Sequence, residues 1–126
     1  PYKHTYSAKI YEQMYLIEND KNALINMEET ARQGLEKYSE RPHLYDVLGK
    51  ALIYQGKYKE GEENFLKTLS INQQNELYQW VNIYKRLGVV YLHAGRNDLL
   101  LVNLKRAMDF DFRYRALYPA LRPLTA

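Results

Sequence analysis

The side chains that could do chemistry are scattered along this chain. The three histidines, His4, His43 and His93, lie far apart in the sequence. Only His43 has a carboxylate one helical turn away, at Asp46, and no nucleophile accompanies that pair. Nucleophilic catalysis needs a nucleophile beside an oriented base, and a metal site needs more than two ligands. We therefore expect no catalytic residue, no bound metal and no enzymatic activity.

Acidic clusters do not change this expectation. Glu28 and Glu29, and likewise Glu60, Glu62 and Glu63, fall on helices predicted to face solvent. We expect these carboxylates to be solvated, since charged residues are rarely buried without partners.

Glycine and aromatic residues are better explained by packing than by ligand binding. Helical periodicity between Gly49 and Gly56 excludes a phosphate-binding loop, so no cofactor is expected. Aromatic rings near Lys and Arg can stack single-stranded nucleic acid. The thirteen tyrosines, however, favour helix packing, and nucleic acid is not an expected partner.

Length and charge indicate one compact domain or a short run of repeats. The 126 residues carry a net charge of +3. Residues 1–63 hold nine Lys/Arg against eleven Asp/Glu, which gives −2, whereas residues 64–126 hold nine against four, which gives +5. The basic half could favour an acidic partner, but we prefer the interpretation that these charges lie on solvated helix faces. No apolar run approaches the roughly 20 residues of a membrane span, so we expect no membrane insertion by this segment.

The compartment is left open by the composition. The absence of cysteine suits a reducing cytosol and slightly favours the cytoplasm, but a domain without cysteine also works elsewhere. The sequence starts at Pro1 with no leader, so we expect a fragment of a longer protein.

Apolar residues recur at spacings of three and four, which predicts an all-α chain. Short polar breaks separate the periodic stretches, and such connections place neighbouring helices antiparallel. The predicted helices span residues 4–19, 22–38, 43–55, 58–70, 75–94 and 97–109, with a short broken helix after them. Pro42 suits a helix start, and Pro119 and Pro123 should stop a long final helix.

Two segments share one pattern without gaps. Each has an aromatic residue, two residues, Leu-Gly, two residues and a large apolar residue, with a second Gly four residues later. The first segment contains Tyr45, Leu48, Gly49, Leu52, Gly56, Gly61 and Phe65, and the second contains Tyr84, Leu87, Gly88, Tyr91, Gly95, Leu100 and Leu104. The pattern resembles the tetratricopeptide repeat (TPR). The resemblance implies a right-handed superhelical stack of antiparallel helical hairpins, an α-solenoid.

Packing explains the repeated residues. The first glycine of each segment, Gly49 or Gly88, should lie at a close helix crossing, and the second should end a helix in a left-handed conformation. Phe65 and Leu104 should fill the space between the helices of their own hairpins. At one position the two segments differ, because Leu100 stands in the third hairpin where a TPR carries a small residue.

The register predicts a single TPR-like domain over residues 1–126. It comprises a degenerate hairpin at 8–41, a repeat at 42–74, a repeat with a lengthened first helix at 75–110, and a C-terminal capping segment at 111–126. The Leu-Gly steps are 39 residues apart instead of the usual 34, and Trp80 should lie on the added part of the first helix. A cap would leave the protein monomeric. The alternatives are that the last segment begins another hairpin of a longer protein, or that it pairs between chains and produces a dimer.

In the TPR family the first helices line a concave groove that holds a peptide. The groove positions implied here are His43, Asp46, Lys50, Ile53, Tyr54, Asn82, Lys85, Val89, Leu92 and His93, with Lys9, Glu12, Leu16 and Asn19 as an extension. The clamp for chaperone tails is not expected, because only Arg86 matches its residues. A peptide with a few hydrophobic anchors suits this mixed lining better.

The resemblance implies a protein–protein interaction scaffold, part of a larger bacterial protein, that binds a protein or peptide of unknown identity. The alternative is the peptide-sensing or effector domain of a TPR-containing transcriptional regulator. Nothing within the sequence separates these two functions.

Overall fold

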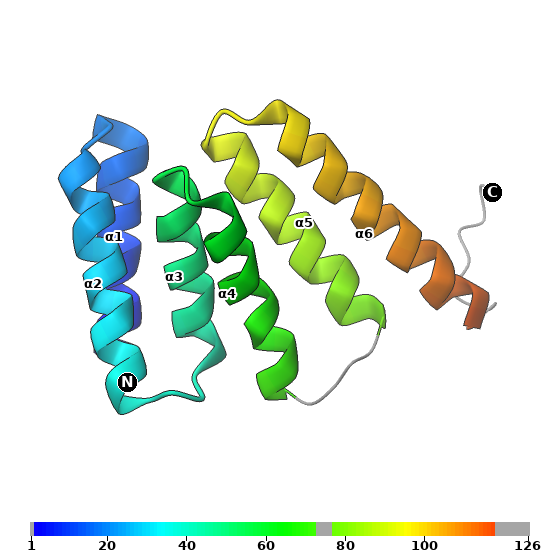
Figure 1. Ribbon diagram of the computed structural model, residues 1–126, viewed down its shortest axis with the longest axis horizontal. Helices are drawn as coiled ribbons and strands as arrows, with labels where there is room; N and C mark the ends of the chain where they lie inside the picture. Colours follow the sequence, from blue (N-terminus) through cyan, green and yellow to red (C-terminus); the bar gives the residue numbers. More distant parts are fainter. Residues whose placement is uncertain (1, 73–76, 118–126) are drawn as a thin grey trace. The chain divides into compact units, whose positions relative to one another are not determined.

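The computed structural model describes residues 2–72 and 77–117, which are helical apart from short connections (Figure 1). Within those ranges there are six helices and no strand. The helices are α1 (Tyr2–Glu18), α2 (Lys21–Lys37), α3 (Pro42–Tyr54), α4 (Tyr58–Asn72), α5 (Leu77–His93) and α6 (Asn97–Leu117). The expected all-α class is therefore confirmed. Every predicted boundary except the end of α6 agrees within two residues.

The chain divides into two compact units, residues 1–73 with α1 to α4 and residues 74–126 with α5 and α6. This division falls within one residue of the predicted boundary between the second and third repeats. None of the described helices is long and apolar enough to cross a membrane.

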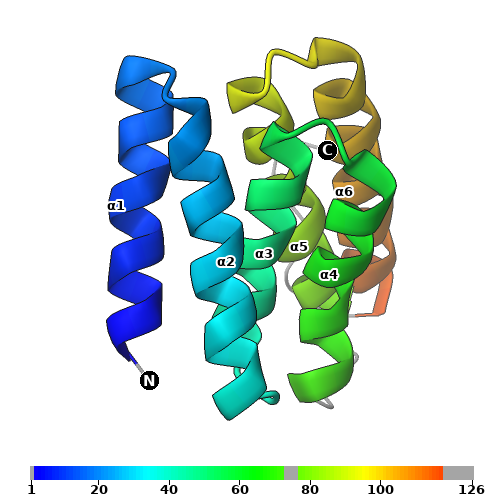
Figure 2. The same cartoon turned by 60° about the vertical axis from the view of Figure 1, so that its left-hand side comes forward.

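The core of the first unit joins α1, α2 and α3, which pack against one another (Figure 2). Ala8 of α1, Met27 and Ala31 of α2, and Leu48 and Ala51 of α3 form one buried cluster. These residues recur at helical spacing, so each helix turns one apolar stripe toward the others. Burying one large aliphatic side chain contributes roughly 1.5–3 kcal/mol, so Met27 and Leu48 contribute strongly to the stability of this cluster.

The α3 and α4 helices approach each other at two glycines. A Cβ atom added to Gly49 would lie 2.8 Å from the carbonyl oxygen of Gly61 and 2.6 Å from Cδ2 of Phe65. The reverse contact is equally short, since a Cβ on Gly61 would lie 2.8 Å from the oxygen of Gly49. The expected close crossing at Gly49 is confirmed, and Phe65 is fully buried beside it, as predicted.

The α3–α4 and α5–α6 turns each contain a glycine in the left-handed backbone conformation. Gly56 after α3 has φ of 86° and Gly95 after α5 has φ of 75°, as the repeat pattern predicts. The next residue in each turn donates its amide to a carbonyl five residues earlier, from Lys57 to Leu52 and from Arg96 to Tyr91. These bonds satisfy carbonyls at the helix end that have no partner within the helix.

The helix starts follow similar local rules. Asp20 caps α2 by accepting from the amides of Asn22 and Ala23, and Pro42 begins α3 as expected. Pro is favoured there because a first-turn amide has no partner within the helix. The α1–α2 turn uses Asn19, whose φ of 54° is one that asparagine tolerates.

The second unit packs α5 against α6. Leu87 and Tyr91 of α5 are fully buried, with Ala107 of α6 nearly so. Trp80 and Tyr84 stack with Phe110, their ring centroids 5.4 and 5.6 Å from that of Phe110. As expected, α5 is longer than α3, with 17 residues against 13.

One predicted helix end in this unit is wrong. The helix expected to end at 109 continues to Leu117 as part of α6. Phe110 holds this part of the helix against α5, and an ion pair of 3.0 Å between Arg113 Nη2 and Asp109 Oδ2 spans one further turn. Leu104 lies against Gly88 of α5 as expected, 3.3 Å from where a Cβ on that glycine would stand, but 38% of its surface is exposed, whereas its neighbour Asn103 is fully buried.

The predicted capping segment at 111–126 is therefore helical in its first part, since residues 111–117 extend α6. Residues 118–126, including Pro119 and Pro123, lie outside the described residues, as do residues 73–76 between α4 and α5.

Candidate functional site

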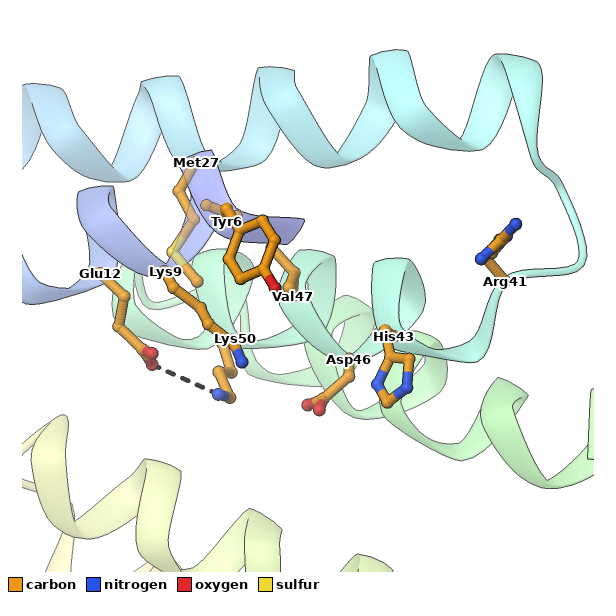
Figure 3. Close-up of a pocket in the computed structure, with 10 residues that line it drawn as sticks. Tyr6, Lys9, Glu12, Met27, Arg41, His43, Asp46, Val47 and Lys50 are labelled. Carbon is orange, nitrogen blue, oxygen red and sulfur yellow. Dashed lines mark ion pairs between the residues drawn. The ribbon is translucent and has the colours of Figure 1, made fainter. Parts of the chain in front are cut away.

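A cavity of about 270 Å³ opens between α1 and α3 in the first unit. Most of the residues that line it are polar or charged (Figure 3). The lining residues are Tyr6, Ala8, Lys9 and Glu12 of α1, Met27 of α2, Arg41, and His43, Asp46, Val47 and Lys50 of α3. We refer to it below as the α1/α3 pocket.

Helical spacing brings the charged residues of α3 to this pocket. His43, Asp46 and Lys50 follow one another at three and four residues and so lie on one face of the helix. Lys9 and Glu12 do the same on α1. Because Ala8 is buried in the core cluster beside α3, the residue that follows it, Lys9, is held at the pocket wall.

Glu12 is the most strongly engaged group of the pocket. Its Oε2 lies 3.5 Å from Nζ of Lys50 and accepts a hydrogen bond of 3.1 Å from the hydroxyl of Tyr54. Burial raises the pKa of Tyr54 far above its usual value, and the adjacent Glu12 carboxylate raises it further. Tyr54 therefore remains a neutral donor at physiological pH, and its ring packs on Tyr15 with a centroid distance of 5.1 Å.

The remaining groups give the pocket a mixed charge. Lys9 and His43 are exposed, whereas Asp46 is buried beside them on the wall. Arg41 stands at the start of α3, its guanidinium 5.4 Å from the ring centroid of Tyr38. Three cationic side chains, Lys9, Arg41 and Lys50, thus line a pocket that has two carboxylates, Glu12 and Asp46. Such a lining suits a polar or charged group that can use donors and acceptors at once.

The structure brings together part of the predicted groove. His43, Asp46 and Lys50 line the pocket with Lys9 and Glu12 from the predicted extension, while Leu16 and Asn19 do not. Their meeting depends on the packing of α1 against α3.

Two predicted groove residues are buried instead. Ile53 is 1% exposed, because its side chain fills the space beside Gly61 at the α3–α4 crossing. Tyr54 is also buried and reaches the site only through its hydroxyl group, which holds Glu12. The sequence spacing predicted both side chains on the groove face of α3, whereas both are buried in the protein.

The other five predicted positions belong to the second unit. They are exposed along α5: Asn82, Lys85, Val89, Leu92 and His93. Val89 and Leu92 provide apolar surface within this polar strip.

Sequence reasoning missed five residues that line the pocket: Tyr6, Ala8, Met27, Arg41 and Val47. Arg41 directly precedes the helix-starting Pro42 and stands two residues before the predicted groove residue His43. Met27 replaces the small residue expected on the second helix, so its longer side chain reaches the pocket wall. Tyr6 had no comparable signal.

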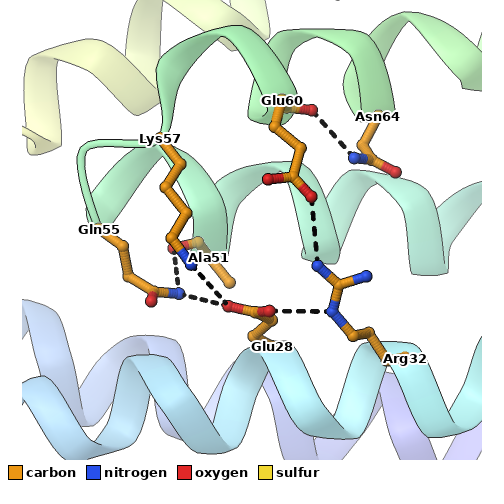
Figure 4. A network of polar contacts seen from close by, with 7 residues as sticks. All are labelled: Glu28, Arg32, Ala51, Gln55, Lys57, Glu60 and Asn64. Atoms are coloured by element: carbon orange, nitrogen blue, oxygen red, sulfur yellow. Dashed lines mark hydrogen bonds and ion pairs between the residues drawn. The ribbon is translucent and has the colours of Figure 1, made fainter.

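A second polar cluster joins α2 to the α3–α4 turn (Figure 4). Glu28 accepts hydrogen bonds of 2.9 Å from Gln55 Nε2 and from Arg32 Nε, and Arg32 Nη2 reaches Glu60 Oε1 at 3.3 Å. Burial opposes ionisation of Glu28, but the bonds from Gln55 and Arg32 lower its pKa overall. The expectation that Glu28 is simply solvated is thus wrong, because the cluster stabilises the contact between helices.

The pocket lining contains no Ser, Thr or Cys to act as a nucleophile. Among the described residues, no group of three or more His, Cys, Asp or Glu could hold a metal ion.

No protein-family model, curated protein or solved structure matches the chain significantly. The likeness to TPR repeats rests on the residues and packing of the chain itself.

Proposed function

We propose that this chain is a TPR-like interaction scaffold, a right-handed superhelical stack of antiparallel hairpins that binds a peptide or partner protein in the groove formed by its first helices. It performs no chemistry of its own. The α1/α3 pocket is the part of the groove that recognises a polar or charged group of the partner.

The observation that carries the proposal is the convergence of α1 and α3 on one pocket. Lys9 and Glu12 from α1 meet His43, Asp46 and Lys50 from α3. All five had been expected from the repeat register, which places groove residues on first helices. The link from Glu12 to Lys50 and Tyr54 pre-organises the wall, and this lowers the entropic cost of ordering side chains when a partner binds.

The repeat register itself is supported by local geometry. The Gly49–Gly61 crossing and the left-handed Gly56 and Gly95 occur where a TPR needs them. In the second unit, Val89 and Leu92 of α5 are exposed next to Lys85 and His93, so this helix offers hydrophobic anchor positions on its own surface.

Selection from a displayed library of random peptides tests this proposal. Enriched peptides should bind the purified chain in fluorescence polarisation. Lys9→Glu, which places a second carboxylate beside Glu12, should weaken binding by about tenfold or more, equivalent to about 1.4 kcal/mol. His43→Ala should also weaken binding.

The matched control is Lys59→Glu, the same charge reversal at an exposed position of α4 that does not line the α1/α3 pocket. It should bind as the unmodified chain does. Failure to enrich any peptide, or peptides whose binding ignores both pocket variants, would exclude this pocket as the recognition site.

A further inference from the structure

The outer face of α1 carries a stripe of exposed apolar side chains. Ile10 is 62% exposed and Ile17 is 77% exposed, with Met14 between them. Their spacing of four and three residues places all three on one helical face. Figure 2 shows α1 at an edge of the first unit, beside α2. Contiguous apolar surface of this kind usually marks an interaction site.

The repeat register identifies what this face resembles inside the molecule. With the 34-residue step from the first hairpin to the second, Ile10, Met14 and Ile17 correspond to Leu44, Leu48 and Ala51 of α3. All three α3 residues are buried, and Leu48 and Ala51 share the core cluster with α2. The α1 helix thus exposes the repeat positions that are buried in α3, where they face α2.

The exposed side of α6 corresponds to the side of α2 that packs against α3. Leu101, Leu104, Met108 and Phe112 form its apolar stripe, with Met108 58% and Phe112 64% exposed. The steps of 39 and 34 residues map Leu104 and Met108 onto Ala31 and Leu35 of α2. Both α2 residues pack in the cluster that joins α2 to α3.

We propose that α6 of one copy of this chain docks on α1 of a second copy, as α2 docks on α3 within the chain. The α1 stripe corresponds to the α3 side of the internal α2–α3 contact, and the α6 stripe corresponds to the α2 side. Each stripe is therefore complementary to the other stripe on a second copy, and not to an identical stripe. The interface is heterologous, and each bound copy still offers a free face. Association is therefore head to tail and grows with concentration, driven by the burial of both stripes.

Sedimentation velocity of the full chain across a range of concentrations tests this proposal. The average mass of the unmodified chain should rise with concentration. Ile10→Lys with Ile17→Lys should block the α1 face, and Met108→Lys with Phe112→Lys should block the α6 face. Each blocked chain alone should stay monomeric, because every copy then keeps the same single face and no copy offers the complementary one.

Mixing the two blocked chains gives the sharpest result. The first retains its α6 face and the second its α1 face, so an equimolar mixture should form a dimer of twice the monomer mass and nothing larger. The matched control is Ile25→Lys, an exposed apolar position of α2 outside both stripes, which should associate like the unmodified chain. None of the substituted residues lines the α1/α3 pocket, so peptide binding is tested separately.

Cross-linking tests the contact even if a lysine variant folds poorly, because the chain has no cysteine of its own. Chains with Ile17→Cys and Leu104→Cys, mixed under mild oxidation, should form the mixed disulfide in preference to either homodimer. This pair corresponds to Ala51 and Ala31 of the internal cluster.

Several outcomes would overturn the proposal. An unmodified chain that stays monomeric at every concentration would do so. A dimer that persists when only α6 is blocked would indicate a symmetric α1–α1 contact. Stronger association of a chain ending at Leu117 would indicate that residues 118–126 cover the α6 stripe within one copy.

Discussion

Gly49 of α3 and Gly88 of α5 occupy the same position of the repeat, yet their neighbours differ. A Cβ at Gly49 would meet backbone atoms, with the oxygen of Gly61 at 2.8 Å and the nitrogen of Phe65 at 3.3 Å. At Gly88 the nearest atoms are side-chain carbons of Leu100 and Leu104, both at 3.3 Å. The first glycine permits contact between backbones, while the second faces side chains that can move.

The residue on the opposite helix explains this difference. Gly61 faces Gly49, whereas the equivalent position facing Gly88 is Leu100, whose side chain fills the gap. A glycine in one helix therefore produces a close crossing only when its partner is also small. The α5–α6 pair instead uses the stacked rings of Trp80, Tyr84 and Phe110 farther along the helices.

The largest expected difference between the pairs concerns Phe65 and Leu104, which are equivalent in the repeat. Phe65→Ala should destabilise the protein by about 3–5 kcal/mol, because it removes a fully buried ring and leaves a cavity. Leu104→Ala should cost about 1–2 kcal/mol, since part of that side chain is already in water. Urea unfolding followed by circular dichroism measures both, and equal losses would contradict the comparison.

The two glycines at the crossings should respond with opposite sign. Gly49→Ala should destabilise by about 1–3 kcal/mol, because the backbone of α4 cannot move away without disturbing its packing. Gly88→Ala should cause no loss, and a gain of up to about 1 kcal/mol from helix propensity, as the leucines shift slightly. Thermal unfolding of the two variants checks this. A clear loss at Gly88 would show that its helices are as tightly packed as α3 and α4.

The turns should not distinguish the pairs. Gly56→Ala and Gly95→Ala should each cost about 1–2 kcal/mol, because alanine is strained at the positive φ of both residues. Gly56→Asn is the control and should recover part of that loss, since Asn19 already occupies such a conformation. Unequal losses in chemical denaturation would indicate that the two turns do more than reverse the chain.

The smallest expected effect is a gain. Asn103 is fully buried with its Oδ1 unpaired, and its Nδ2 donates to the carbonyl of Leu99 at 2.8 Å. Asn103→Leu should stabilise by about 1 kcal/mol, because it removes a buried acceptor that has no donor. The equivalent Asn64 makes the same bond to Glu60 but is not buried, so Asn64→Leu should be nearly neutral in the same thermal assay.

Part of the candidate site could be predicted from the sequence, and part could not. His43, Asp46 and Lys50 were expected together because helical spacing alone places them on one face. Ile53 follows the same spacing but packs beside Gly61, which lies eight residues away on another helix. Periodicity describes one helix at a time, so it does not show which edge of a polar face a neighbouring helix will cover.

The sequence by itself determined the features that depend on near neighbours. Helix starts and ends, including Pro42 and the left-handed Gly56 and Gly95, follow from the dihedral preferences of a few consecutive residues. The end of α6 does not follow from near neighbours alone. Phe110 stacks on Trp80, thirty residues earlier, and this contact stabilises the helix beyond its predicted end.

Only the tertiary structure decided how closely the helices approach and what lies between them. The same Leu-Gly step gives backbone contact at Gly49 and side-chain contact at Gly88, because the packing distance is set jointly by both helices. For the same reason the α1/α3 pocket depends on the small side chain of Ala8, which allows α1 to pack in the core cluster beside α3. A residue's type limits how near a neighbour can come, but the neighbour's own side chain determines the distance that results.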